Sequence, residues 1–240
     1  MSNPLEQFNI KKIIPIEIGG YDVSFTNSSL FMILAVISCG VLFLCCLRGR
    51  AVFPTGKQAF VEIIYDFIHN LMRENIGPEG LKYFSFIFSL FLFVAFGNVL
   101  GLFPYSFTFT SHVAAVGTLS LVALLFNVVI GIKKKKWGYI HTFMPKGIPW
   151  ALAPLVMPIE LVSLLSKPFS LTVRLVANMT VGHIMLKVIA GFVVALGIAG
   201  VVPILFDAGI IIFELFIALL QAFIYTVLSC IYLGDAIHGH

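Results

Sequence analysis

Five long apolar runs constrain the fold of this chain. They lie at about 30–47, 84–103, 113–132, 152–202 and 203–233, and a helix of about 20 mainly apolar residues is long enough to cross the hydrocarbon core of a bilayer. Charged residues make up 11% of the sequence and hydrophobic residues 60%, whereas a soluble domain is about one quarter charged. The sequence therefore predicts an all-α polytopic membrane protein with about five to six membrane helices.

The fourth run is too long for one upright span. Its roughly 50 residues would form a helix about 75 Å long, against a hydrocarbon core of about 30 Å. Pro154, Pro158 and Pro168 lie inside this run. Either the run breaks at its prolines, or it lies strongly tilted against a protein partner.

The chain is predicted to form a single membrane domain, residues 1–240, in three parts. Residues 1–28 are a polar lead that ends in S-F-T-N-S-S, a cluster of helix N-cap residues. Residues 29–150 hold the first spans and an amphipathic helix, and residues 151–240 hold the last two apolar runs. Because the lead lacks the basic end and short apolar core of a signal peptide, we expect the chain to be made on the side where it inserts, or to insert through its first apolar helix.

Residues 56–75 have the pattern of an amphipathic helix at the membrane interface. Apolar residues recur there at helical spacing, with polar and charged residues between them. The apolar set is Phe60, Ile63, Ile64, Phe67, Ile68 and Leu71, and the polar set is Lys57, Glu62, Asp66, His69 and Arg73. Such a helix is expected to lie along the membrane surface rather than across it.

Basic residues predict which side of the membrane each loop faces, because inside loops carry an excess of Lys and Arg. The loop before the second span carries Arg48, Arg50, Lys57, Arg73 and Lys82. A run of four lysines, 133–136, follows the third span, and the loop between these two spans has no Lys or Arg. Both basic loops are therefore predicted inside and the N-terminus outside. The net charge of +4 is explained by the basic residues of these inside loops, and no nucleic-acid partner is expected.

The cysteines and histidines give no sign of a metal site. Cys39, Cys45, Cys46 and Cys230 fall in apolar stretches, and no C-x-x-C or histidine spacing typical of a metal site occurs. The sequence also lacks H-E-x-x-H, G-x-S-x-G and Walker motifs. These absences disfavour an intramembrane enzyme and a nucleotide-binding subunit, and we expect no cofactor.

Polar residues inside the fourth run are few and regularly spaced. Glu160, Lys167 and Arg174 are seven residues apart, and Asn178 lies one turn after Arg174. At 100° per residue, Arg174 and Asn178 share one side of a helix, while His183 falls on the opposite side. A guanidinium at mid-bilayer depth costs roughly 3 to 17 kcal/mol, so such a residue is normally kept for a function.

The fifth run carries a second polar stripe. Asp207, Glu214 and Gln221 are again seven apart, with Tyr225 one turn later. Two such stripes on adjoining helices are what a buried proton path needs, since protons move through groups that bind and release them. Arginine, with a pKa above about 12, cannot relay a proton, but it can hold a carboxylate in its charged form.

Two other interpretations stay open from the residues alone. An ion pair from Arg174 to Glu160 or Glu214 would simply pin two helices together. A self-contained secondary transporter or ion channel would also place an arginine and acids at mid-depth. Such a protein is expected to show paired repeats or discontinuous helices in both halves, and this sequence shows neither.

Two segments resemble a known family. S-L-L-S-K-P-F-S-L-T-V-R-L-V-A-N-M-T-V-G-H and E-L-F-I-A-L-L-Q-A-F-I-Y-T-V-L-S-C-I-Y-L are similar to subunit a of rotary F-type ATP synthases. The likeness extends to F-T-N-S-S-L-F before the first span, N-V-L-G-L-F-P-Y at the end of the second, and the closing Y-L-G-D-A-I-H-G-H. Many bacterial members have an acid where this chain has His183 and a histidine where it has Glu214. The exchanged arrangement in this chain is similar to that of the mitochondrial and alphaproteobacterial branch.

This resemblance implies a proton-translocating stator subunit of the Fo sector, packed against a ring of c subunits. Two aqueous half-channels would couple proton flow to rotation of the ring and so to ATP synthesis, with the hairpin of residues 151–240 strongly tilted along the ring. The subunit would be non-catalytic and multi-pass, in a mitochondrial or bacterial inner membrane. Its implied partners are the c-ring, the peripheral-stalk b subunits, other Fo and F1 subunits and membrane lipid.

The resemblance also implies roles for individual residues. Arg174 matches the essential arginine of the family, which faces the carboxylates of the ring. Asn178 and Gln221 match the polar residues beside that arginine. Three titratable residues match positions that line the half-channels: Glu160, His183 and Glu214.

Overall fold

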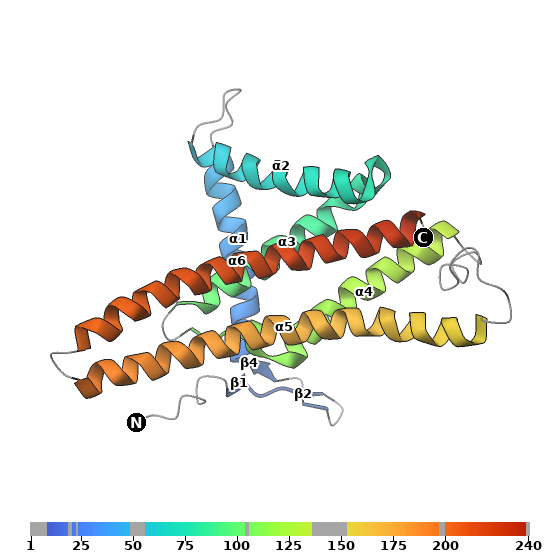
Figure 1. Ribbon diagram of the computed structural model, residues 1–240. Coiled ribbons are helices and arrows are strands. Elements are labelled where there is room, and N and C mark those ends of the chain that lie inside the picture. Colours follow the sequence, from blue (N-terminus) through green and yellow to red (C-terminus); the bar gives the residue numbers. More distant parts are fainter. Residues whose placement is uncertain are drawn as a thin grey trace. The chain divides into compact units, whose positions relative to one another are not determined.

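The described part of the chain is almost entirely helical. The computed structural model describes residues 9–18, 21–22, 24–48, 56–103, 106–135, 153–196 and 200–238. The elements in chain order are β1 (Lys12–Ile14), β2 (Glu17–Ile18), β3 (Tyr21–Asp22), β4 (Phe25–Thr26), α1 (Asn27–Leu47), α2 (Gly56–Ile76), η2 (Pro78–Tyr83), α3 (Phe84–Gly101), η3 (Phe109–Ser111), α4 (Val113–Lys135), α5 (Ala153–Leu196) and α6 (Val201–His238) (Figure 1). The prediction of an all-α polytopic membrane protein is confirmed.

Within the described ranges, five segments are long and apolar enough to cross a membrane. They coincide with the five apolar runs of the sequence, and their bounds are Asn27–Leu47, Pro78–Gly101, Val113–Lys135, Leu155–Val193 and Val201–His238. In lipid, a backbone that pairs its own N–H and C=O groups along a helix avoids unsatisfied polar groups. Long apolar runs of this kind therefore fold as helices whatever their detailed sequence.

Helix α5 continues through its prolines. It runs for 44 residues with Pro158 and Pro168 inside it, so of the two open alternatives the break at a proline is wrong. Proline removes one backbone donor, but helices in membranes tolerate that loss because neighbouring groups satisfy the freed carbonyl. At 1.5 Å per residue α5 is about 66 Å long, roughly twice the thickness of the hydrocarbon core.

The polar lead is tied to the start of α1. Strand β1 pairs antiparallel with β4, and β2 with β3, which the sequence did not predict. The backbone N–H of Asn27 donates to the Lys11 carbonyl (3.1 Å), and its side-chain amide donates to the Asn9 carbonyl (3.2 Å). Thr26 Oγ1 accepts the backbone N–H of Ser29 (3.4 Å), which confirms the predicted N-cap cluster.

Contacts divide the chain into two compact units, each assembled from pieces of several helices. The first unit comprises Met1–Leu42, Leu92–Val116 and Arg174–Ala222. The second comprises Phe43–Phe91, Gly117–Val173 and Phe223–His240.

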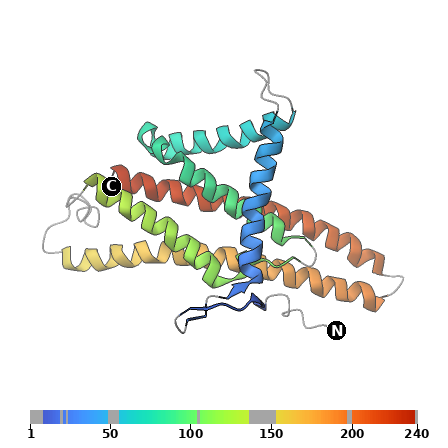
Figure 2. The same cartoon turned by 180° about the vertical axis from the view of Figure 1, so that it is seen from behind.

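The core of the first unit forms where the segment 106–112 folds back on α1 and α3. Phe107 and Phe109 are buried with Ala35. The Phe107 ring lies 6.3 Å from that of Phe31, and the Phe109 ring lies 5.4 Å from that of Phe93, between centroids. Figure 1 and Figure 2 both show the parts of α5 and α6 in this unit side by side, with α1 running across them.

The core of the second unit contains α2, α3, α4 and α6. Its buried residues are Ile68, Met72, Ile76, Ile87, Ile130, Cys230, Leu233 and Ile237. Because the α2 members are four residues apart, they form one side of that helix.

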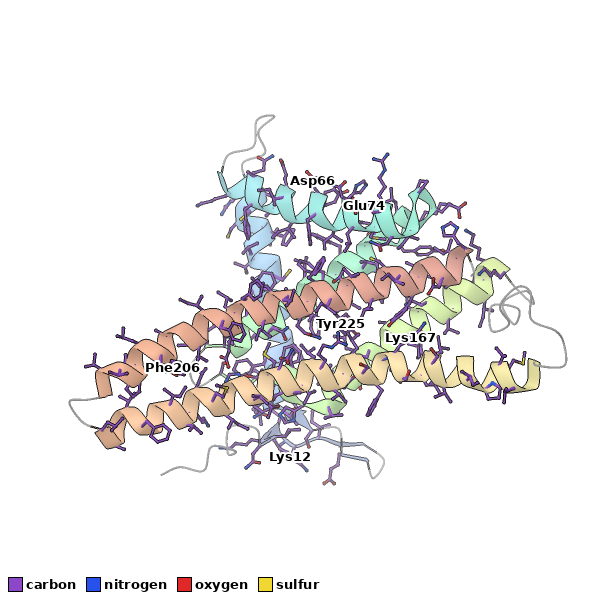
Figure 3. The ribbon with its side chains drawn as sticks, in the orientation of Figure 1. Lys12, Asp66, Glu74, Lys167, Phe206 and Tyr225 are labelled. Atoms are coloured by element: carbon purple, nitrogen blue, oxygen red, sulfur yellow. The ribbon has the colours of Figure 1, made fainter. Side chains whose placement is uncertain are left out.

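The apolar residues of α2 are divided between two sides. Ile68 is buried, whereas Phe60, Ile63 and Phe67 of the predicted apolar set are 53%, 67% and 45% exposed. The acidic side chains Asp66 and Glu74 are exposed as well (Figure 3). The helix is amphipathic as predicted, but its inward side includes Met72 and Ile76, which the predicted set omitted.

Candidate functional site

Arg174 and Asn178 lie on the exposed side of α5 in the first unit. Both side chains are exposed, and the same side continues with Val181, Met185 and Val188, which are exposed as well. The spacing of three and four residues makes this one stripe of the helix. A permanent positive charge therefore stands in an apolar surface that faces away from the rest of its unit.

His183 lies on the opposite side of the same helix. It is buried, in register with buried Met179 and Leu175, which lie four and eight residues before it. The predicted division of α5, with Arg174 and Asn178 on one side and His183 on the other, is confirmed. The division follows from helical periodicity alone.

The polar stripe of α6 faces into the first unit. Glu214 and Gln221 are buried, and Ala218 between them is fully buried. The side-chain amide of Asn98 in α3, itself fully buried, donates to the Ala218 carbonyl (3.1 Å). Asn98 thus fixes α6 beside α3 at the level of the two polar residues.

Helices α5 and α6 run antiparallel in this unit, and two contacts set their register. Asn178 Nδ2 donates to Gln221 Oε1 at 3.5 Å. Further along, the carboxyl group of Glu214 lies against the backbone of Gly182, where an added Cβ would come within 1.8 Å of Glu214 Oε1. The Glu214 carboxyl group occupies the space that a Cβ at position 182 would take, and it therefore lies beside the residue that precedes His183.

Thr108 joins His183 to α3. Its Oγ1 lies 2.8 Å from His183 Nε2 and donates to the Gly101 carbonyl (3.1 Å). Thr108 is not among the residues predicted from the sequence, because nothing in the periodicity of α3 or α5 relates a loop residue to a helix position 75 residues later. A threonine set among aromatic residues in S-F-T-F-T-S was the only available signal.

The charged side chains of two candidate site residues, Arg174 and Glu214, are not paired with each other. Among the described residues, no carboxylate forms an ion pair with Arg174, and both carboxyl oxygens of Glu214 are buried with no hydrogen-bond partner. An internal Arg174–Glu214 bridge is therefore not formed. The side chain of Glu160 lies outside the described residues, although its position falls within α5.

The second unit holds two further polar residues of these stripes, Lys167 and Tyr225. Tyr225 is buried, with its hydroxyl 3.4 Å from Ser120 Oγ, and Thr172 Oγ1 lies 3.1 Å from the same Ser120 oxygen. The ammonium group of Lys167 lies 4.6 Å from the centre of the Tyr232 ring, and Lys167 and Tyr225 are labelled in Figure 3. Ser120 and Thr172 were not singled out from the sequence.

Comparisons with a family profile and with individual relatives agree with one another. A family profile described as ATP synthase A chain matches residues 29–234. A protein from Rhodospirillum rubrum named ATP synthase subunit a is 50% identical over 241 residues, covering 100% of both chains. Proteins of the same name from Paramagnetospirillum magneticum and Chelativorans sp. are 49% and 46% identical over 247 residues, covering 100% of this chain and 100% and 99% of theirs.

Proposed function

Because the chain belongs to the ATP synthase subunit a family, the proton-translocating stator subunits of the Fo sector, we propose that its proton path is formed by residues of α5 and α6. The proposed set is Arg174, Asn178, Gln221, His183, Glu214 and Glu160. A self-contained transporter or channel is not favoured, since the family match covers residues 29–234.

The observation that carries the proposal is the guanidinium of Arg174, which is exposed and has no ion-pair partner within the described part of the chain. An uncompensated charge in an apolar stripe is costly in lipid, so the partner that covers this stripe must supply a carboxylate. A ring of c subunits with one acid per subunit meets that need. At 4 Å and an effective dielectric of about 20, the attraction between the two charges is about 4 kcal/mol.

His183 and Glu214 are proposed to line the half-channel on the outer side. His183 hydrogen-bonds Thr108, which belongs to the Lys- and Arg-free loop that the basic-residue rule predicts outside. Glu214, beside Gly182, has two buried oxygens without a fixed donor among the described residues. A carboxyl group in such surroundings can gain and lose a proton without breaking an ion pair.

Glu160 is proposed to line the other half-channel. The start of α5 follows the lysine run in the chain, so the basic-residue rule predicts the inner side for this end of the helix. The two channels would then open on opposite sides, with Arg174 between them as a charge that repels a proton passing straight through.

The mechanism couples proton flow to rotation. A proton from one half-channel neutralises a ring carboxylate, and the neutral site can face lipid at little cost. After rotation the site releases its proton to the other half-channel and returns charged to Arg174, which cannot itself relay protons. Each proton that crosses supplies about 2.3 kcal/mol per 100 mV of membrane potential.

The lengths of α5 and α6 support a hairpin lying strongly tilted along the ring. To stay within a core of about 30 Å, a helix about 66 Å long must lean by roughly 60° from the membrane normal. The other proposed partners are the peripheral-stalk b subunits and the remaining Fo and F1 subunits. We assign the chain to a bacterial inner membrane of alphaproteobacterial type, as a subunit without catalytic residues of its own.

Arg174→Ala is expected to abolish ATP-driven proton pumping, since the returning ring carboxylate loses its counter-charge. Inverted membrane vesicles containing the whole complex are energised with ATP, and acidification is followed with a pH-sensitive dye. The amount of assembled complex is measured on the same vesicles. Pumping near the wild-type rate by a normally assembled Arg174→Ala complex would refute the proposal.

Arg73→Ala provides a matched control. Arg73 is an exposed arginine of α2, outside the five candidate spans. Removing it is expected to leave pumping within about twofold of wild type, because an exposed surface charge contributes little.

A further inference from the structure

The segment 106–112 packs against α3 where two glycines leave space for its side chains. Gly97 and Gly101 are one turn apart on α3. A Cβ on Gly97 would come within 2.4 Å of the Phe109 ring, and a Cβ on Gly101 within 2.6 Å of Thr108 Cγ2. The absence of side chains at both positions lets Thr108 and Phe109 pack directly on the backbone of α3.

This packing brings the Thr108 hydroxyl to the imidazole of His183. Thr108 Oγ1 lies 2.8 Å from His183 Nε2, and both residues are buried, at 4% and 8% exposed. Water therefore has little access to the bond. The Gly101 carbonyl accepts a hydrogen bond from the Thr108 hydroxyl group (3.1 Å).

The Thr108 hydroxyl group can serve two partners at once. A hydroxyl group has one hydrogen to donate and two lone pairs to accept with. Thr108 Oγ1 lies within hydrogen-bond distance of both the Gly101 carbonyl (3.1 Å) and His183 Nε2 (2.8 Å), so this one hydroxyl group links the ring to the backbone of α3.

We propose that Thr108 is the positioning residue of His183: its hydroxyl group contacts Nε2 and thereby holds the ring toward α3 in the orientation that proton transfer requires. This inference rests on the proposed role of His183 in the outer half-channel. It gives the Lys- and Arg-free loop a part in proton transfer that its composition did not suggest.

Two substitutions at Thr108 distinguish the effect of the hydroxyl group from the effect of side-chain volume. Thr108→Val keeps the volume and removes the hydroxyl, whereas Thr108→Ser keeps the hydroxyl and removes a methyl group. We expect Thr108→Val to lower ATP-driven pumping by about tenfold, because one buried partner is left unsatisfied. Thr108→Ser is expected to stay within about threefold of wild type. Pumping is measured per assembled complex in inverted vesicles.

A packing role predicts the reverse order, with Val better tolerated than Ser. That order, or equal pumping by both variants and wild type, would overturn the proposal. Thr110→Val is the matched control in the same segment, since Thr110 is also buried but its Oγ1 has no partner among the described residues. It is expected to pump like wild type, and a loss as large as that of Thr108→Val would also overturn the proposal.

Pumping measurements on the same vesicles distinguish failure of this inference from failure of the proposed function. If Arg174→Ala abolishes pumping while Thr108→Val pumps normally, the function stands and the role of Thr108 fails. If Arg174→Ala pumps normally, the proposed function fails first.

Discussion

At the residue scale, Gly182 determines where the Glu214 carboxyl group lies. A Cβ at position 182 would come within 1.8 Å of Glu214 Oε1, so Gly182→Ala must push the carboxyl group away from α5. A misplacement of about 1 Å at a reacting group can cost on the order of 100-fold. We expect Gly182→Ala to reduce ATP-driven pumping at least tenfold while the complex still assembles, as measured in inverted vesicles with the subunit content determined in parallel.

Gly191→Ala tests whether any added methyl group on α5 has this effect. Position 191 is in the same helix, and an added Cβ there would meet no atom within 4 Å. Pumping by this variant is expected to match wild type. Equal losses in the two variants would mean that α5 is sensitive to helix-wide changes rather than to the place of Glu214.

At the scale of elements, the segment 106–112 and α3 fit together through Gly97. Gly97→Ala would bring a Cβ within 2.4 Å of the Phe109 ring, and overpacking of this kind costs about 1–3 kcal/mol. We expect the purified complex to release this subunit at a lower temperature. The measurement is heating in detergent followed by analysis of the remaining assembled complex.

Reducing the size of the opposing side chain should restore the fit. Adding Phe109→Leu to Gly97→Ala is expected to raise the release temperature again, since the two changes act at one contact and are not additive. Gly40→Ala in α1, where nothing lies within 4 Å, serves as the control. Failure of Phe109→Leu to recover any stability would show that the glycine is needed for another reason.

The elements differ in how much of them could be predicted. The five spanning segments follow from apolar runs that lipid allows to fold only as helices, and the division of α5 into an Arg174 side and a His183 side follows from its period. The continuity of α5 through Pro158 and Pro168 could not be decided, because it depends on neighbouring groups that satisfy the freed carbonyls. The Gly182–Glu214 and Thr108–His183 contacts escaped prediction as well, since periodicity carries no information about which helices pack together.

At the scale of the whole molecule, the basic residues predict an outside N-terminus and an inside lysine run. In a variant whose four cysteines are replaced by alanine, Lys12→Cys and Lys133→Cys each introduce one exposed thiol. A membrane-impermeant maleimide added to intact cells is expected to label position 12 only. Inverted vesicles should show labelling at position 133 only, and the opposite pattern would reverse the orientation and the sides of both half-channels.

The outward-facing guanidinium of Arg174 also has a consequence for how many copies of this chain a cell keeps. Until a partner covers that side of α5, the charge raises the free energy of the isolated chain in the membrane by at least about 3 kcal/mol. Unassembled copies are therefore the less stable population and the more exposed to degradation. On the proposed assignment, the lasting abundance of the subunit follows the supply of rings rather than its own rate of synthesis.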